Sequence, residues 1–324
     1  MVQDSPGTGI ATLTLNPALD LQTAVDRVEP ENKLRCDAPR QDAGGGGVNV
    51  SRVIRRLGGR APCLLPLGGP AGRALEARLA AEGLEARVIP IAGETRQSFT
   101  VFDRSRRAEF RFVLPGPRLS AREIEALEQA LGDLHPQPGV LVLSGSLPPG
   151  FPPARLTRLA ARLRRRGIRL ALDASGEGLK AGLAAGVWLV KPNRKELGDC
   201  LGQDLADRPR QLEAARSLVA AGRARWVALS LGQDGALLVG EGFAGYAPAL
   251  PITPVSTVGA GDSFLAGLSW ELCRGASPEA ALVTAVAAAS ATLLSPGSGM
   301  ARRADIRRLR PQVRVEVLEG ATAR

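Results

Sequence analysis

Residues 139–172 read GVLVLSGSLPPGFPPARLTRLAARLRRRGIRLAL, and their pattern determines the fold class. The apolar run Val140–Leu143 predicts a buried strand, and the spacing of apolar residues over Ala154–Arg166 predicts an amphipathic helix. A second apolar run, Ile168–Leu172, predicts the next strand. Continuously apolar strands separated by amphipathic helices indicate an α/β fold, in which a mostly parallel sheet is covered by helices on both faces.

The same alternation continues on both sides of this stretch. Further strands are predicted at Gly9–Leu15, Ala61–Leu67, Val187–Val190 and Trp226–Leu231, and further helices at Ala74–Ala81 and Arg210–Ala221. Ser120 and Glu123 have the spacing of a capping box for a helix that runs to Leu131. Neither a linker-like composition nor an internal repeat divides the chain, so we expect a single domain over residues 1–324. Ligands should bind beyond the carboxyl ends of the strands.

Two segments, Thr23–Gln41 and Gln97–Leu114, interrupt the alternation. They contain short stretches of period two, such as Glu109–Val113, which predict antiparallel strands projecting as a lid over the site. A small lid sheet exposes an apolar face, and a second copy of the chain could cover it. A homodimer through the lid is therefore expected.

The scarcity of histidine argues against several kinds of catalysis. His135 is the only histidine and lies in a Pro/Gly-rich run, which disfavours Ser–His–Asp hydrolysis, Cys–His proteolysis and multi-histidine metal sites. Any general base should therefore be a carboxylate. The four cysteines are far apart and form no CxxC pair, as is typical of a reduced cytoplasm; they are Cys36, Cys63, Cys200 and Cys273.

The net charge of +10 raises the possibility of nucleic-acid binding. Aromatic residues make up only 3% of the chain, and the densest arginine runs fall in helix-like patterns, so solvated helix faces explain the charge better. The apolar run Ala280–Leu294 is too short to span a membrane and reads as a helix packed inside the domain. No Lys or Arg precedes Arg27, which argues against a secretory signal peptide. We expect a cytoplasmic protein without nucleic-acid or membrane partners.

The run Ser256–Ser263, STVGAGDS, is the strongest indication of chemistry. Its glycines permit a tight turn, and the helix predicted to follow adds free N–H groups and the positive end of its dipole, which together favour an anion. Asp262 would lie beside the bound negative charge, where a carboxylate can take a proton from an attacking hydroxyl. A turn with a helix N-cap explains the run alone equally well.

A glycine-rich loop, Gly44–Gly47, precedes Asn49 and a second helical pattern. Its backbone can contact a polyhydroxy ligand, although a flexible loop with an N-cap is the alternative. Asp20 is read as following the first strand, where a carboxylate can accept bonds from sugar hydroxyls or act as a turn residue.

Two further motifs each allow two interpretations. Asn193 and Glu196 lie three residues apart at a predicted helix start, and they fit either the hydrated shell of Mg²⁺ or a capping box. The run Ser230–Gly235 fits either a phosphate or ribose loop, or a hairpin turn.

Taken together, these motifs resemble the ribokinase-like carbohydrate kinases of the PfkB family. The resemblance covers essentially the whole chain, from Leu13–Pro17 to Ser295–Gly297, with signatures at Gly44–Arg52, Asn193–Glu196 and Thr257–Ser263. Within the family, the runs Lys33–Cys36 and Ser144–Gly150 are most similar to bacterial ATP-dependent 6-phosphofructokinases. Gly46 stands where 1-phosphofructokinases and tagatose-6-phosphate kinases carry lysine, so these activities are the alternatives. A nucleoside kinase or a non-catalytic sugar-binding regulator fits less well.

The resemblance also implies roles for individual residues. Asp262 would be the general base, and the backbone of Gly259, Ala260 and Gly261 would complete the anion hole. The sugar phosphate would be bound by Asp20, Lys33, Gly45, Gly46, Gly47, Asn49, Arg96, Arg111 and Ser146, with Arg96 reaching across from a partner's lid. ATP would be bound by Lys191, Asn193, Ser230, Gly232 and Gly235. Glu196 would organise Mg²⁺ through water, and K⁺ ligands would fall at Ser256, Val258, Thr292 and Gly297. Ser295 and Gly299 depart from the Asn and Arg of close relatives near that K⁺ site.

Overall fold

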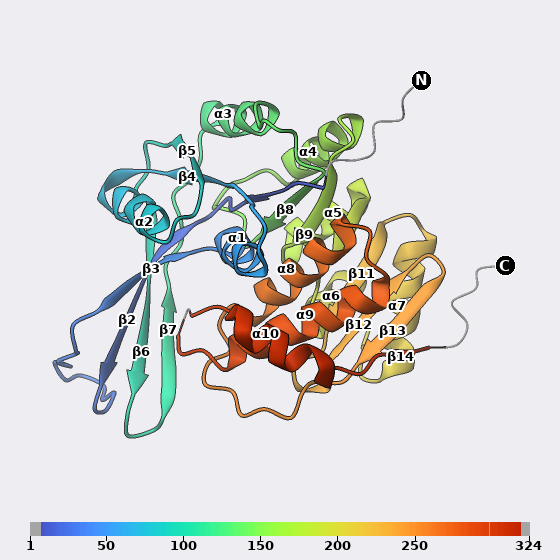
Figure 1. The fold of residues 1–324 in the computed structure, drawn as a ribbon. Coiled ribbons are helices and arrows are strands. Elements are labelled where there is room, and N and C mark those ends of the chain that lie inside the picture. The colour runs from blue at the N-terminus through green and yellow to red at the C-terminus, as the bar shows by residue number, and fades with distance from the viewer. Residues whose placement is uncertain (1–7, 298, 319–324) are drawn as a thin grey trace.

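The computed structural model describes residues 8–297 and 299–318, and a ten-stranded sheet forms the centre of this part of the chain (Figure 1). In spatial order its strands are β14 (Glu316–Val317), β13 (Phe243–Ala247), β12 (Ala236–Gly240), β11 (Ala224–Ser230), β10 (Val187–Val190), β9 (Arg169–Asp173), β8 (Val140–Ser144), β1 (Ile10–Leu13), β4 (Cys63–Leu67) and β5 (Ala86–Pro90). Neighbouring strands from β11 to β5 run parallel, while β12, β13 and β14 join antiparallel. The predicted fold class is confirmed.

Helices cover both faces of the sheet, because its strands are apolar on both sides. Every residue of β4 and β8 is buried. Residues of one helical layer share a core with the sheet; its members are α1 (Gly46–Leu57), α8 (Ala260–Cys273), α9 (Pro278–Leu293) and α10 (Arg303–Leu309). A second core joins the sheet to α3 (Ala121–Gly132), α4 (Pro153–Arg165), α5 (Gly176–Ala185), α6 (Arg194–Leu201) and α7 (Arg208–Ala220). The remaining helix, α2 (Gly69–Ala81), packs between β4 and the lid.

The alanine-rich run predicted to be a buried helix is α9, and it packs closely on α8. A Cβ atom on Gly267 would lie 2.7 Å from the Cα atom of Ala285, so the two backbones approach to a distance that only glycine allows. Ala281, Ala285 and Ala288 have no exposed surface. None of the helices in the described ranges combines the length and the apolar composition needed to cross a membrane.

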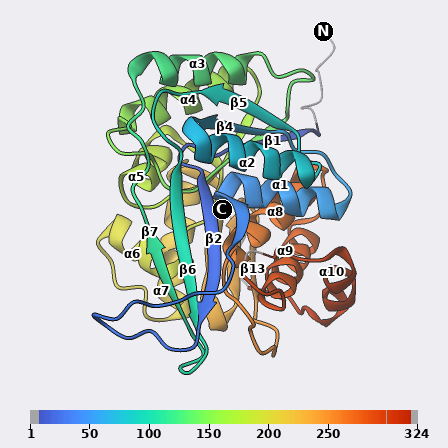
Figure 2. The same cartoon turned by 90° about the vertical axis from the view of Figure 1, so that its left-hand side faces the viewer.

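The lid is a separate four-stranded sheet that extends away from the main sheet (Figure 1) and faces the viewer in Figure 2. Its strands, in order, are β3 (Arg40–Gly44), β2 (Ala18–Val25), β6 (Arg96–Asp103) and β7 (Ala108–Val113). The expectation of purely antiparallel pairing was wrong, because β2 and β6 are parallel. Each continues through a short loop from a parallel strand of the main sheet, β1 or β5, so both leave it in the same direction.

The boundaries of the lid also differ from the prediction. Its first strand begins at Ala18, so Asp20 lies within β2 rather than in a turn after the first strand. The residues 26–39 form no strand in the structure. Pro30 and Pro39 lie in this stretch, and proline cannot donate to a strand ladder.

Candidate active site

A cavity of about 200 Å³ lies between the lid, α1 and the N-terminus of α8. It brings together predicted site residues that are distant in sequence. Among its lining residues are Asp20, Gly45, Gly46, Asn49, Arg96, Arg111, Val258, Gly259, Asp262 and Gly297. The lid strands contribute cations at one end, and the start of α8 contributes a carboxylate at the other.

Asp262 lies in the first turn of α8 and accepts hydrogen bonds from two neighbouring elements. Its Oδ2 accepts from Asn49 Nδ2 at 2.9 Å, and its Oδ1 accepts from Ser144 Oγ at 3.0 Å. Burial raises the pKa of this carboxyl to about 6, and the negative charge of Asp173 adds to the effect. The bonds from Asn49 and Ser144 and the charge of Lys191 act in the opposite direction. The result is a carboxylate that is held in place and basic enough to accept a proton near neutral pH.

The N-terminus of α8 forms an anion-binding turn. Gly259 has φ of 75°, and no side chain caps the helix. The backbone N–H groups of the first turn therefore have no side-chain acceptor, and they lie with the positive end of the dipole beside Gly259 and Asp262, which line the cavity. A Cβ atom on Gly259 would lie 2.3 Å from Met300 Cε, so the turn needs glycine both for its conformation and for its contact with Met300.

Lys191 is a buried cation beside this turn. Its Nζ lies 3.1 Å from Asp173 Oδ2, and its side chain is only 6% exposed. Burial by itself would lower the pKa of Lys191, but Asp173, with smaller effects of Asp262 and Glu196, raises that pKa above its ordinary value. The lysine therefore stays charged. A Cβ atom on Gly261 would lie 3.4 Å from its Nζ, which places this positive charge next to the helix N-terminus.

The glycine-rich loop packs against the base and its neighbours. Gly45 has φ of 133°, a conformation that L-residues rarely adopt. A Cβ atom on Gly46 would lie 2.2 Å from Ser144 Oγ, and one on Gly47 would lie 2.6 Å from Thr14 Oγ1. Gly46 thus leaves space for the hydroxyl that bonds to Asp262, whereas Gly47 packs towards β1.

Asp20, Arg96 and Arg111 form the lid end of the cavity. Burial raises the pKa of Asp20 to about 6, although Arg96 and Arg111 both act to lower it. Arg96 donates to the carbonyl oxygens of Asn16 and Leu114 at 3.0 and 3.1 Å. These bonds hold the guanidinium group of Arg96 in the cavity of its own chain.

Three predicted sugar-phosphate residues lie outside the cavity lining. Lys33 is exposed in the irregular stretch of residues 26–39. Ser146 follows β8 and accepts a bond from Asn16 Nδ2 at 3.1 Å. Gly47 is buried at the start of α1.

At the two motifs with two interpretations, the structural alternative is present. Asn193 and Glu196 form a capping box: Asn193 Oδ1 accepts from the Glu196 N–H at 2.8 Å, and Glu196 Oε2 accepts from the Asn193 N–H at 2.9 Å. Ser230–Gly235 connects the antiparallel strands β11 and β12 through a 3₁₀ turn at Gly232–Asp234. The two motifs are adjacent, because Asn193 and Ser230 form an isolated parallel bridge.

The predicted potassium ligands lie near the anion-binding turn. Thr292 Oγ1 lies 2.6 Å from Ser263 Oγ and accepts from the Ala301 N–H at 2.9 Å. Ser256 Oγ accepts from the Val258 N–H at 3.3 Å. These hydroxyls have partners within the protein, and so does the Thr292 carbonyl, which accepts from the Ser295 N–H at 2.9 Å.

Sequence reasoning missed four residues connected to the base. Ser144 and Asp173 each end a strand of the main sheet, so the rule that ligands bind at carboxyl ends could have found them. Arg52 and Glu82 reach the base only through Asn49. No local motif predicts the contact between Arg52 and Glu82, since it joins α1 to the residue that follows α2.

The sheet, the lid and a buried carboxylate at a glycine-turn helix N-terminus define a kinase of the ribokinase-like fold. The model of the pfkB family of carbohydrate kinases matches residues 14–304, and the chain belongs to that family. The predicted family and enzyme class are confirmed.

Named relatives agree with this assignment. The chain is 44% identical over 299 residues to ATP-dependent 6-phosphofructokinase isozyme 2 of Mycobacterium tuberculosis, covering 92% of this chain and 88% of the relative. It is 32% identical to 1-phosphofructokinase of Vibrio cholerae, covering 95% and 97%. The structure of phosphofructokinase-2 from Escherichia coli in complex with fructose-6-phosphate superimposes with a TM-score of 0.89 at 37% identity, covering 94% and 98%. The same enzyme has been solved with potassium (TM-score 0.91) and as a tetrameric inhibited form (TM-score 0.89), each at 38% identity and with the same coverage.

Proposed function

We propose that this chain is an ATP-dependent 6-phosphofructokinase, which transfers the γ-phosphoryl group of ATP to the 1-hydroxyl of fructose 6-phosphate. The observation that carries the proposal is the polarity of the cavity. Its lining has a basic carboxylate, Asp262, from α8 and two arginines, Arg96 and Arg111, from the lid strands β6 and β7. A sugar that already carries a phosphate needs a fixed cation far from the base, and the arginine fork suits phosphate oxygens.

Asp262 then acts as the general base. A bound sugar hydroxyl near Oδ1 or Oδ2 loses its proton to the carboxylate as its oxygen bonds to the γ-phosphorus of ATP, while the bond between that phosphorus and the β,γ-bridging oxygen breaks and ADP leaves. The donors Asn49 and Ser144 hold the carboxylate in one orientation at 2.9 and 3.0 Å. Positioning of this kind is the main protein contribution to phosphoryl transfer.

Charge on the transferring group is stabilised by two features. The N–H groups of Gly259–Asp262 lie where the γ-phosphoryl oxygens gain charge, and Lys191 adds a buried positive charge beside them. Asn193 and the Ser230–Gly235 turn adjoin Lys191 in the sequence or the sheet, and we assign ATP to this side. Binding ATP there points its γ-phosphoryl group towards Asp262.

Glu196 fits a magnesium ion that is bound through water. Its Oε2 is used in the capping box, and Oε1 makes no contact with the described residues, so one carboxylate oxygen remains for a hydrated cation. When bound, Mg²⁺ would neutralise part of the negative charge of the ATP phosphates. The capping box and the magnesium role are therefore compatible.

We extend the same proposal to K⁺ at the backbone carbonyls of Ser256 and Val258, which are hard oxygen ligands near the anion-binding turn.

The outer face of the lid supports a homodimer. Phe99 and Phe112 are paired across β6 and β7 and are 39% and 52% exposed. Apolar side chains at this exposure are typical of a surface that a partner covers.

The four cysteines are free thiols, which supports a reducing compartment such as the cytoplasm.

The proposal is tested by identifying the product. Incubation with fructose 6-phosphate and MgATP should give ADP and fructose 1,6-bisphosphate in equal amounts, as measured by ³¹P NMR. Hydrolysis of ATP without a bisphosphate product would contradict the proposal.

A further inference from the structure

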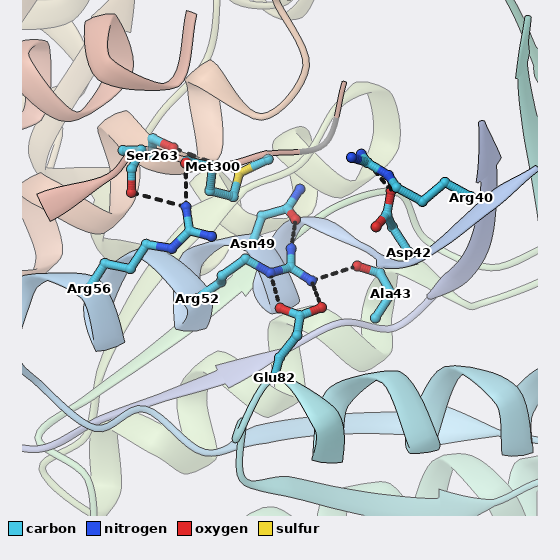
Figure 3. A network of polar contacts seen from close by, with 10 residues as sticks. Arg40, Asp42, Ala43, Asn49, Arg52, Arg56, Glu82, Ser263 and Met300 are labelled. Carbon is cyan, nitrogen blue, oxygen red and sulfur yellow. Dashed lines mark hydrogen bonds and ion pairs between the residues drawn. The ribbon is translucent and has the colours of Figure 1, made fainter. Parts of the chain in front are cut away.

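A buried arginine next to the cavity connects the base to the rest of the fold. Arg52 lies on α1, three residues after Asn49, and is only 6% exposed. Its guanidinium contacts three elements: Nη1 donates to Asn49 Oδ1 at 2.7 Å, Nη2 to Ala43 O in lid strand β3 at 3.0 Å, and Nη2 to Glu82 Oε1 after α2 at 2.9 Å (Figure 3). Arg52 Nε also donates to Glu82 Oε2, so the ion pair is bidentate.

The chemistry of these groups fixes the orientation of the Asn49 amide. A guanidinium can only donate hydrogen bonds, so the atom of Asn49 that faces it must be the carbonyl oxygen. The NH₂ group then faces Asp262 and donates to Oδ2. If the amide rotated by half a turn, its oxygen would face a carboxylate oxygen and repel it.

We propose that Arg52, held in place by Glu82, is a positioning residue for phosphoryl transfer: it locks the amide of Asn49 so that its NH₂ group always faces Asp262. Arg52 lies at a distance from the reacting atoms and acts only through Asn49. The inference rests on the proposed role of Asp262 as the general base. It goes beyond that role by assigning a function to an ion pair between α1 and α2.

The fixed orientation of the Asn49 amide also affects the charge of Asp262. A donor to the carboxylate favours its ionised form, as Ser144 and Lys191 also do, whereas Asp173 and burial favour the protonated form. Asp20 and Glu109 are the other acids that line the cavity, and the charges of Arg96 and Arg111 lower the pKa of Asp20. Loss of Arg52 frees the Asn49 amide and so weakens one stabilising donor to Asp262. It also removes a charge that lowers the pKa of Asp20, while Ser144, Lys191 and Asp173 stay in place.

The first test compares Arg52→Met with Arg52→Lys. Methionine fills similar space without a donor, whereas lysine keeps one donor for Asn49 Oδ1. Arg52→Met should lower kcat about 10- to 100-fold, as for a displaced catalytic group, with little change in KM for either substrate. The acidic limb of its kcat–pH profile should move to higher pH. Arg52→Lys should recover most of the loss in kcat.

A matched control separates positioning from stability. Arg155 pairs with Glu125 and Glu128 between α3 and α4 on the other face of the sheet, and its side chain is 19% exposed. Arg155→Met should lower the melting temperature without moving the pH profile. If Arg52→Met also changes only the melting temperature, or if Arg52→Lys loses as much kcat as Arg52→Met, the proposal is overturned.

A milder variant covers the case in which Arg52→Met does not fold. Glu82→Gln keeps the shape and one acceptor but removes the charge that holds the guanidinium, and it should shift kcat and the acidic limb in the same direction by less. An unchanged profile for Glu82→Gln would contradict the role of the pair. Asp262→Asn, measured in parallel, tests the role of Asp262 as the base separately from the positioning role of Arg52. If it retains full kcat, the base assignment fails; if it is inactive while the Arg52 variants are normal, only the positioning role fails.

Discussion

The hydroxyl of Ser144 donates to Oδ1 of Asp262 across 3.0 Å, and this contact joins the end of β8 to the first turn of α8. Asn49 supplies the second donor from α1. Three elements that are distant in sequence therefore hold one carboxylate. The predictions below follow from the space, charge and hydrogen bonds around it.

Gly46→Ala should lower kcat, because a Cβ atom there would lie 2.2 Å from Ser144 Oγ and would displace the hydroxyl from Asp262. We expect a loss of about 10-fold or more, measured by steady-state kinetics. Gly9→Ala is the control, since its Cβ atom would meet only Pro138 Cα at 3.8 Å. Equal kinetics for the two variants would show that the Ser144 contact has no catalytic value.

Asp262→Asn should lower kcat by about 10²- to 10⁴-fold while substrate binding stays nearly intact. The amide keeps the shape of the side chain but cannot take the hydroxyl proton. Steady-state kinetics separate kcat from KM. A steep rise in KM with kcat nearly unchanged would make Asp262 a binding residue instead.

The activity should fall as the pH drops through about 6, because the pKa of Asp262 is raised from 3.8 to about 6 and only the ionised carboxylate accepts a proton. The contribution of this group to stability has the opposite trend. The folded state keeps the proton at pH values where the unfolded state has lost it, so this contribution is complete below 3.8 and declines as the pH rises to about 6. Two measurements over this pH range check these opposite trends. The kcat of the native enzyme reports the trend in activity, and the melting temperatures of the native and Asp262→Asn proteins report the trend in stability. An acidic limb near 4 would mean that burial does not raise the pKa of the base.

Glu196→Gln should raise the Mg²⁺ concentration needed for half-maximal rate, because an anionic acceptor for the hydrated ion is lost. Glu123→Gln is a matched control, since Ser120 and Glu123 form the same capping box at the start of α3. Gln also completes a capping box, so both variants should lose only the interaction of the charge with the helix dipole, about 0.3 to 1 kcal/mol in thermal or urea unfolding. If Mg²⁺ dependence is the same in both, Glu196 has only its structural role.

The sequence predicted the central strands of the main sheet well because strands such as β8 and β10 are apolar and buried along their length. The strand predicted at Val140–Leu143 and the helix predicted at Ala154–Arg166 each lie within one residue of the observed bounds. The lid was predicted less accurately. Its strands β2 and β6 are largely half-buried, and a pattern of period two does not show that they pair in parallel.

The candidate site was predicted where a motif is contiguous and missed where a contact is long-range. Asp262 and the glycine loop could be found from local runs, and the cavity contains both. Ser144 and Asp173 lie near the base only because the parallel strands end at one edge of the sheet, and Asn49 connects Arg52 to the base only because α1 packs on α8. Such contacts depend on tertiary packing, which a single sequence does not specify residue by residue.

The identity of the phosphoryl acceptor is tested most directly by measuring kcat/KM with MgATP for four sugars. These are fructose 6-phosphate, fructose 1-phosphate, tagatose 6-phosphate and unphosphorylated fructose. Fructose 6-phosphate should have the highest value, because Arg96 and Arg111 from the lid strands line the cavity and can bind its phosphate while Asp262 on α8 takes the proton of the 1-hydroxyl. Tagatose 6-phosphate differs in the stereochemistry of one hydroxyl and should react more slowly. A higher kcat/KM for fructose 1-phosphate, or for fructose itself, would contradict the assignment.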